Sequence, residues 1–173
     1  MPKRHHPLPF VWLMTDERLG DDLWSALAAL PKGRAGIVFR HYATPERDRR
    51  MLFEAVRRIA RARRLMLILA DTPRRARGWR AQGSHGRHHG ALTAPAHSTR
   101  ELRAAERAGA ALIFLSPVFA TRSHAGAQPL GRVRFGLIAQ QARRPIIALG
   151  GMTQARFAPL KSEKIFGWAA IDG

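Results

Sequence analysis

The hydrophobic positions of this chain fall into short runs that alternate with amphipathic stretches. Eight runs have the length and apolar character of buried strands. These runs lie at 10–15, 36–40, 65–70, 81–85, 91–97, 111–116, 145–149 and 165–171, and the run at 81–85 is the weakest. Runs that are apolar throughout are typical of parallel strands covered on both faces.

The segments between these runs predict helices at 21–30, 44–64, 98–108, 133–143 and 153–160. Two of them begin with clear start signals. Thr44-Pro45-Glu46 offers an N-cap, a proline at the first helical position and an early acid. Ser98 and Glu101 have the spacing of a capping box. The stretch 72–90 is rich in arginine, glycine and histidine and predicts no helix.

Alternation of strands and helices predicts an α/β fold with a parallel sheet. A closed barrel and an open doubly wound sheet both satisfy the pattern. An open nucleotide-binding sheet expects a glycine fingerprint after its first strand, whereas this turn reads Thr15-Asp16-Glu17-Arg18. We therefore predict one domain over residues 1–173, a (βα)8 TIM barrel that is shortened and lacks its last helix.

Composition narrows the class of protein. The 173 residues include no cysteine, which excludes disulfides, thiolate metal sites and a cysteine nucleophile. The apolar run at 10–14 is too short for a signal peptide, and no run approaches the roughly 20 apolar residues of a membrane span. We expect a cytoplasmic protein with no membrane partner.

The charge is strongly positive, with 30 Lys and Arg against 12 Asp and Glu, or +18. Such a charge attracts phosphates, nucleic acids and anionic membranes without selecting among them. A genome of high GC content also produces excess arginine, so the functional and the compositional interpretations both stay open. No recognised nucleic-acid motif or aromatic interleaving is present, and a nucleic-acid partner is the less favoured expectation.

Two loops are candidates for binding an anion. In (βα)8 barrels, phosphate is often held by the loops after the last two strands. Gly150 and Gly151 follow the strand at 145–149, where backbone N–H groups can approach an anion and the next helix begins nearby. The glycines could also serve only a tight turn, but the phosphate interpretation is favoured. Thr121, Arg122 and Ser123 follow the strand at 111–116 and offer hydroxyls and a guanidinium, so we predict that the two loops converge on one anion pocket.

Several segments together resemble the thiamine phosphate synthase family, which includes the thiazole tautomerases. They are Ser116-Pro-Val-Phe-Ala-Thr121, Gly131, Pro145-Ile-Ile-Ala-Leu-Gly-Gly-Met152, Leu13-Met-Thr-Asp16, Arg40, Asp71 and His97-Ser-x-x-Glu101. The resemblance implies an eight-stranded barrel. It also implies a reaction that couples a pyrimidine pyrophosphate to a thiazole phosphate with Mg²⁺ and releases pyrophosphate.

The resemblance also assigns roles to residues. Thr121 and Ser123 match the family's paired hydroxyls and Gly151 its phosphate-binding glycine. The set expected around the acceptor phosphate is His97, Thr121, Arg122, Ser123, Gly131, Gly150 and Gly151. On the pyrophosphate side, Arg40 and Asp71 are the expected catalytic residues, with Asp71 also the expected magnesium ligand. Asp172 falls where the family has a small or hydroxyl residue.

The pyrophosphate side departs from the family pattern. The family's Gln-x-Arg-x-Lys signature appears as Val38-Phe-Arg-His-Tyr42, and its Asn-Asp pair as Ala70-Asp71. No second magnesium-binding acid lies near 85–90, while Pro95 and His124 replace a serine and a lysine. The tautomerase branch usually has a histidine where this chain has Pro117.

These departures predict a protein that binds a phosphorylated thiazole-type ligand with weak or absent synthase activity. A catalytically inactive binding or regulatory relative and, less favoured, a basic nucleic-acid binder are the alternatives, and a homodimer is left open.

Three further groups of residues have two interpretations each. His85, His88 and His89 could bind a transition metal, but histidines in an irregular polar loop are more often solvated. The arginines on one side of the 44–64 helix could contact nucleic acid, but a charged outer face is the commoner meaning. They are Arg50, Arg57, Arg61 and Arg64. The tryptophans, Trp12, Trp24, Trp79 and Trp168, are expected in core or interface positions.

Overall fold

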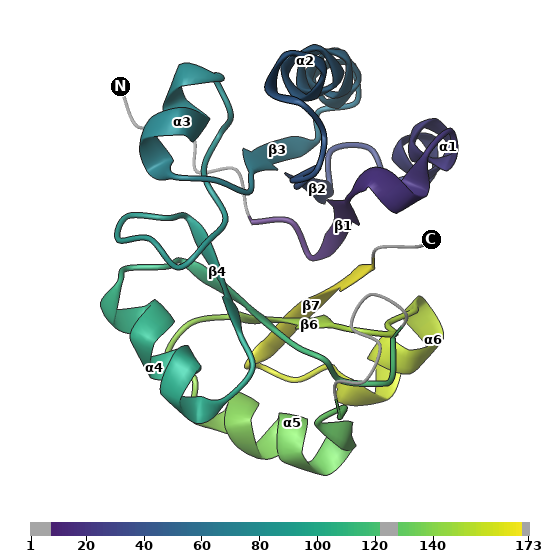
Figure 1. Ribbon diagram of the computed structural model, residues 1–173. Coiled ribbons are helices and arrows are strands. Elements are labelled where there is room, and N and C mark those ends of the chain that lie inside the picture. The colour runs from purple at the N-terminus through teal and green to yellow at the C-terminus, as the bar shows by residue number, and fades with distance from the viewer. Residues whose placement is uncertain (1–7, 122–127, 171–173) are drawn as a thin grey trace, which may run out of the picture.

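A computed structural model describes residues 8–121 and 128–170 of the chain. Seven parallel strands form one curled sheet in the order β3-β2-β1-β7-β6-β5-β4, with helices on its outside (Figure 1). The strands are β1 (Val11–Thr15), β2 (Ala35–Phe39), β3 (Met66–Leu69), β4 (Thr93–Ala96), β5 (Leu112–Leu115), β6 (Ile146–Leu149) and β7 (Ile165–Ala170). Each lies within a run expected from the sequence, apart from one residue at the start of β2.

The eighth expected strand, at 81–85, is reduced to a short connection between β3 and β4. Isolated parallel bridges pair Leu69 with Ser84 and His85 with Thr93. Backbone hydrogen bonds run from the His85 amide to the Leu69 carbonyl (2.8 Å) and from the Thr93 amide to the Ser84 carbonyl (3.1 Å). Residues 84–85 therefore bond to both edge strands and join them, which gives the expected shortened (βα) barrel.

The helices follow the predicted alternation. They are α1 (Asp22–Ala29), α2 (Glu46–Ala62), α3 (Pro73–Gly78), α4 (Thr99–Arg107), α5 (Gly131–Gln140) and α6 (Gln154–Phe157), with 3-10 turns at Glu17–Leu19 and Ala158–Leu160. The sequence interpretation missed α3, although Thr72 caps it through its side chain and Pro73 occupies its first turn. Among the described residues, no helix is long and apolar enough to span a membrane.

One start signal was assigned a residue too early. The N-cap of α2 is Pro45, without a side-chain capping bond, and the helix begins at Glu46. The Thr44 hydroxyl instead donates to a Glu17 carboxylate oxygen at 3.1 Å. The Ser98 cap of α4 is as predicted, since its hydroxyl accepts from the Glu101 amide.

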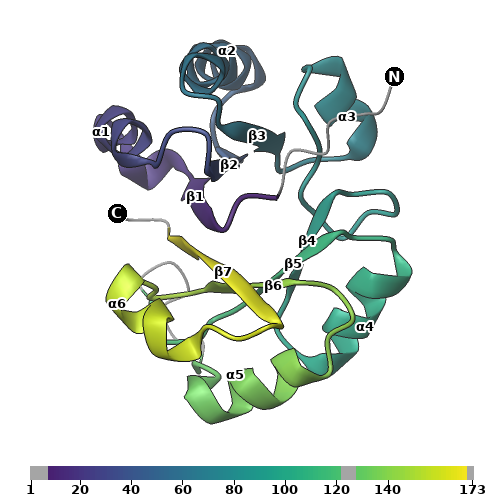
Figure 2. The same ribbon diagram turned by 180° about the vertical axis from the view of Figure 1, so that it is seen from behind.

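Apolar side chains form three separate buried clusters. One lies between β1–β3 and the helices α1–α3, and the second between β4–β7 and the helices α4–α6. The third fills the barrel interior with side chains from both halves, including Trp12 and Phe114, whose rings meet edge to face at 5.4 Å. The two outer clusters correspond to the two groups of helices, which cover the outer face of the sheet on opposite sides of the barrel (Figures 1 and 2).

Side chains in the barrel interior are tightly packed. A Cβ added to Gly36 on β2 would lie 2.3 Å from the Trp12 ring, so the absence of a side chain there makes room for the indole. Trp12 also donates from Nε1 to the Pro9 carbonyl oxygen at 2.7 Å. Trp12 and Trp79 are buried as expected, whereas Trp24 is 40% exposed and does not belong to the core.

A groove lies where the outer layer of helices is incomplete. It runs between α1 and α6 over β1 and β7, with a volume of about 1030 Å³. The described residues end with β7, so the prediction of a missing last helix stays a prediction. The exposed rings of Phe10 and Phe166 line this groove. The homodimer that the sequence leaves open is not tested by the described residues.

Candidate functional site

The carboxyl ends of β1 and β2 are joined by an arginine–carboxylate cluster. Arg40, just after β2, donates from Nε to the Thr15 carbonyl oxygen (3.0 Å) and from Nη2 to Asp16 Oδ2 (2.6 Å). Arg18 forms a second ion pair with Asp16. Asp16 is desolvated by burial, but its bonds to these two guanidiniums outweigh that cost and hold its pKa below the usual value. The Arg40 charge is therefore compensated within the protein.

Asp71 is held in a similar way after β3. Its Oδ1 accepts from the Thr72 amide (2.8 Å), and its Oδ2 accepts from Arg49 Nη1 (3.1 Å) and Arg75 Nη1 (3.3 Å). Burial alone would raise the pKa of this carboxyl. The hydrogen bonds and the two guanidinium charges lower the pKa by more than burial raises it, so the net shift is downward. Both oxygens of Asp71 are thus occupied by donors from the protein.

These contacts bear on magnesium, which prefers carboxylate oxygens and water as ligands. The described part of the chain contains no group of three histidine, aspartate or glutamate side chains placed to hold a metal. Asp71 has guanidinium and amide donors on both oxygens, and Asp16 is paired with two arginines. The described residues as arranged do not fit a protein-held magnesium ion, and magnesium binding at Asp71 stays a prediction.

The barrel mouth is the end of the barrel at which the strands have their carboxyl ends. Arg49 is a key residue of the half formed by β1–β3, and the sequence interpretation missed it. Its side chain is only 6% exposed. Besides Asp71, it donates to the carbonyl oxygens of Arg40 (2.9 and 3.1 Å) and Ala70 (3.3 Å), and its guanidinium lies 5.2 Å from the Trp79 ring. Arg49 therefore ties the ends of β2 and β3 together.

On the other half of the mouth, His97 contacts the end of β5. Its Nδ1 lies 2.9 Å from the Ser116 carbonyl oxygen and 3.2 Å from the Ser116 hydroxyl. A carbonyl oxygen only accepts, so Nδ1 carries the hydrogen in this contact. The His97 amide donates to Glu101 Oε2 at 2.8 Å, which fixes the backbone between β4 and α4.

The loops after β5 and β6 lie against each other, as predicted. A Cβ added to Gly150 would lie 2.7 Å from Pro117 Cα, and one added to Gly151 would lie 2.7 Å from the Ala120 carbonyl oxygen. The Phe119 amide donates to the Gly150 carbonyl oxygen at 3.1 Å. Both glycines have positive φ (97° and 60°), so the turn needs glycine for its backbone as well as for this close approach.

This turn also has groups that can contact an anion. The Gly151 amide has no hydrogen-bond partner among the described residues. Arg156 on α6 donates from Nη1 to the Gly151 carbonyl oxygen (2.5 Å), and its guanidinium lies 5.0 Å from the Phe119 ring. Arg156 was not predicted, although its place three residues after the Thr153 N-cap was a usable signal. Because α6 has only four residues, its dipole adds little to the site.

The remaining predicted residues are placed as follows. Thr121 is half-buried and directly follows Ala120, whose carbonyl oxygen is beside Gly151. Gly131 begins α5 with φ 69°, and its amide donates to the Val118 carbonyl oxygen at 3.1 Å. Arg122, Ser123 and Asp172 lie outside the described residues. The structure thus brings Thr121, Gly131, Gly150 and Gly151 to one pair of loops, while Arg40 and Asp71 lie in the other half.

The three histidines of the 85–90 loop differ in burial and do not form one cluster. His88 and His89 are exposed, as expected for solvated side chains. His85 is instead buried, so the expectation of a solvated side chain is wrong for it. Its Nδ1 lies 2.8 Å from the Thr93 hydroxyl and its ring meets Phe114 at 5.1 Å. Burial lowers the pKa of His85 to about 3, so this imidazole is neutral in the barrel interior.

Comparison with known proteins agrees with this architecture. The family model described as thiamine monophosphate synthase matches residues 86–173, about half of the chain. The chain belongs to this family. A protein of Aquifex aeolicus described as "Putative thiamine-phosphate synthase 2" is 37% identical over 76 residues. That alignment covers 44% of this chain and 41% of the relative's length.

Solved structures share the fold over most of the chain. The thiamine phosphate pyrophosphorylase from Pyrococcus furiosus has a TM-score of 0.78 at 22% identity and covers 93% of this chain and 84% of its own. A structure described as "Native KDPGal" has a TM-score of 0.62 at 12% identity, over 94% and 82%. At these identities the likeness concerns the fold alone.

The family match separates the two halves of the mouth. It begins at residue 86 and includes His97, Thr121 and the Gly150-Gly151 turn. Arg40 and Asp71 lie outside it. The half that matches the thiamine monophosphate synthase family is therefore the half in which the two loops pack against each other.

Proposed function

We propose that this chain is a thiamine phosphate synthase-like protein that binds a phosphorylated thiazole-type ligand, with weak or absent synthase turnover. The observation that carries the proposal is the Gly150-Gly151 turn packed against residues 117–120, with an unbonded Gly151 amide directed to no described partner. The turn lies within the family match, and the chain's relatives carry synthase names.

Three groups have separate roles in this proposal. The Gly151 amide donates to a phosphate oxygen, the Thr121 hydroxyl donates from the adjoining loop, and the Arg156 guanidinium supplies positive charge. Charge-assisted hydrogen bonds to phosphate are shorter and stronger than neutral ones, so Arg156 adds both charge and direction. His97 holds the end of β5 in register through Ser116 and keeps the loop in place.

Weak turnover follows from the other half of the mouth. Transfer to a pyrimidine pyrophosphate needs countercharge on the departing pyrophosphate. Arg40 is paired with Asp16, and Asp71 is paired with Arg49 and Arg75. These pairs offset the Arg40 charge and occupy both oxygens of Asp71, which reduces what the two residues can offer a substrate or a metal ion. The same pairs favour the second candidate, a catalytically inactive relative that binds the phosphorylated ligand for regulation.

A thermal-shift experiment tests the binding proposal. Hydroxyethylthiazole phosphate at about 100 times its Kd should raise the Tm by roughly 5–10 °C. The unphosphorylated alcohol serves as the matched ligand control and should give little shift. Gly151→Ala should lose most of the response, because its Cβ would meet the Ala120 carbonyl oxygen. Arg156→Gln, which keeps both glycines but removes the guanidinium and its bond to the Gly151 carbonyl oxygen, should weaken the response. Equal shifts from phosphate and alcohol would contradict the proposal.

A synthase assay separates the two candidate functions. Both substrates are supplied with Mg²⁺, and thiamine phosphate is measured over time. We expect slow formation at most. Rapid magnesium-dependent turnover that falls tenfold or more in Asp71→Asn would show an active synthase and would overturn the statement on turnover while leaving ligand binding intact.

A further inference from the structure

A second cavity opens at the opposite end of the barrel from the candidate site. It has a volume of about 640 Å³ and lies at the amino-terminal ends of β2 and β3, below the carboxyl end of α2. In (βα)8 barrels this end is away from the catalytic loops. The cavity is therefore separate from the Gly151 turn and from the family's expected chemistry.

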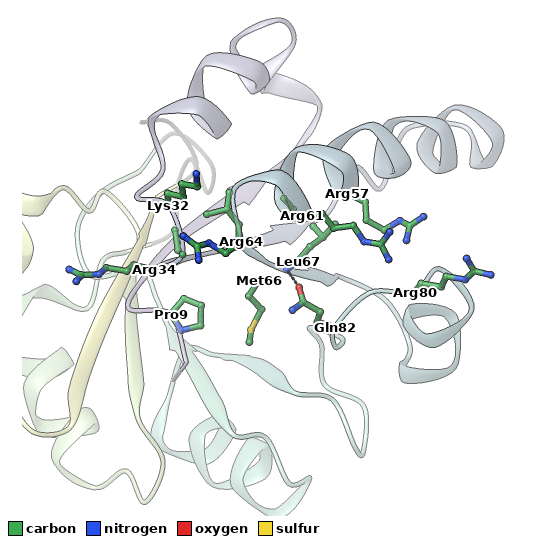
Figure 3. Close-up of a pocket in the computed structure, with 14 residues that line it drawn as sticks. Pro9, Lys32, Arg34, Arg57, Arg61, Arg64, Met66, Leu67, Arg80 and Gln82 are labelled. Atoms are coloured by element: carbon green, nitrogen blue, oxygen red, sulfur yellow. Dashed lines mark hydrogen bonds between the residues drawn. The ribbon is translucent and has the colours of Figure 1, made fainter. Parts of the chain in front are cut away.

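The lining of this cavity is strongly cationic. Six basic side chains line it, Lys32, Arg34, Arg57, Arg61, Arg64 and Arg80, and no carboxylate does so among the described residues. Figure 3 shows these side chains ranged across the view from Arg34 on the left to Arg80 on the right, with Pro9, Met66 and Gln82 below them. The cations thus form a row above a floor that is partly apolar.

Most of these charges have no carboxylate partner in the part of the chain that the structure describes. Arg57 pairs with Glu54, yet its Nη1 is buried without a hydrogen bond. The other five basic side chains make no ion pair with any described carboxylate. Like charges gathered in this way repel, and a bound polyanion would relieve that repulsion. By contrast, Arg40, Arg49 and Arg75 at the barrel mouth are paired with aspartates.

Two of the arginines occupy backbone positions that normally take glycine. Arg64 and Arg80 follow α2 and α3 with φ of 54° and 59°. A side chain in this left-handed region costs conformational energy, although the conformation is common for the residue that ends a helix. A cation near a helix carboxyl end also complements its dipole, but Arg61 in the last turn of α2 already does this without strain.

The row of charges limits which kind of anion can bind in the cavity. A single phosphate would meet only part of a row of six cations, whereas a chain of phosphates could contact several. The volume suits a small molecule. Single-stranded nucleic acid is held largely by stacking on aromatic rings, and no aromatic residue lines this cavity. We propose that the cavity binds an oligophosphate chain, as in a nucleoside triphosphate or inorganic tripolyphosphate.

The test is calorimetric titration of the whole chain with tripolyphosphate at fixed, near-physiological salt. The cavity variant Arg64→Gly/Arg80→Gly removes two charges while placing glycine where φ is positive, so it should fold with an unchanged or higher Tm. Binding should weaken about tenfold or more. The control variant Arg58→Gln/Arg100→Gln removes two exposed charges that do not line the cavity and should bind within twofold of wild type. Arg64→Asn/Arg80→Asn serves as a second variant, because asparagine tolerates the same backbone.

Further titrations separate the sources of the ligand and the competing outcomes. ATP binding tighter than tripolyphosphate would assign a nucleotide, and equal binding an inorganic chain; both support the proposal. Inorganic phosphate should bind at least tenfold more weakly than either. The proposal is overturned if the cavity variant binds tripolyphosphate like wild type, since the anion would then sit at the barrel mouth. It is also overturned if a 20-nucleotide single-stranded RNA binds more tightly than ATP and is lost in the cavity variant.

Discussion

At the scale of single residues, arginine has different roles in different parts of this barrel. Arg40 and Asp71 were expected from the family resemblance, and the structure shows both engaged in ion pairs. Arg49 could have been found from helical spacing, because it lies four residues before Phe53 and seven before Val56 on the buried face of α2. An arginine on that face is unusual, and a carboxylate partner such as Asp71 explains its burial. Which carboxylate it meets depends on the fold and was not readable from α2 alone.

The Arg49–Asp71 contact predicts a large loss of stability in one variant. Asp71→Asn leaves the Arg49 guanidinium buried without its carboxylate, so the free energy of unfolding should fall by about 3 kcal/mol. Urea unfolding measures this. Glu46→Gln is the matched control, because it breaks an exposed ion pair with Arg75 and should cost less than about 1 kcal/mol. Equal losses in the two variants would show that burial of Arg49 does not depend on Asp71.

At the scale of elements, apolar runs located all seven strands, because parallel strands covered on both faces must be apolar throughout. The eighth was marked as the weakest run and is a two-residue connection. Helix α3 was missed because its sequence, Pro73–Gly78, carries three arginines and little apolar periodicity. Thr72 caps the start of this helix, so the start signal was informative although the apolar periodicity was not. Short elements such as these are fixed by pairing with distant strands, which the local sequence pattern does not show.

Glycine positions within elements give a pair of opposite predictions. Gly36→Ala should lower the free energy of unfolding by about 1–3 kcal/mol, because the added methyl group overlaps the Trp12 ring. Gly136→Ala should raise it by about 0.5–1 kcal/mol, because this residue is inside α5 with no atom near the added methyl group. Chemical denaturation of both variants checks the signs. A stabilised Gly36→Ala would mean that Trp12 has room to move.

At the scale of the whole molecule, closure of the ring passes through His85. Its position was assigned to a polar loop, and its burial could not be inferred because the weak strand offers no alternation to orient it. The family resemblance and the barrel were predicted correctly, since they rest on the spacing of many elements. The cavity at the amino-terminal end was not predicted. The arginines of α2 were interpreted as a charged outer face, and only the fold places Arg61 and Arg64 beside Lys32, Arg34 and Arg80.

Burial of His85 predicts how stability depends on pH. Its pKa in the folded protein is about 3, below the ordinary value of 6.5, so below pH 6.5 the unfolded chain binds a proton that the folded chain does not. The free energy of unfolding should therefore fall with falling pH, by about 2 kcal/mol between pH 7 and pH 5 from this residue. Burial also lowers the pKa of His41, which acts in the same direction. Urea titrations at both pH values measure the total.

Two variants isolate the contribution of His85. His85→Gln should flatten the dependence between pH 7 and pH 5, whatever its effect on stability at pH 7. His88→Gln changes an exposed histidine of the same loop and should leave the dependence as in wild type. An unchanged slope in His85→Gln would assign the effect to other groups.

The division of the outer apolar layer into two clusters has a consequence for how this protein can change over evolutionary time. Each cluster packs its own helices, and the two halves meet through the barrel interior, the pairing of β1 with β7 and the bridges at residues 84–85. Substitutions within one layer of helices therefore need little compensation in the other. The family match begins at residue 86, while the preceding half holds both the aspartate-paired arginines and the cavity lined mostly by basic residues without an ion pair among the described residues. We therefore expect substitutions that change function to gather in the amino-terminal half, while the carboxyl-terminal half keeps the residues that match the family.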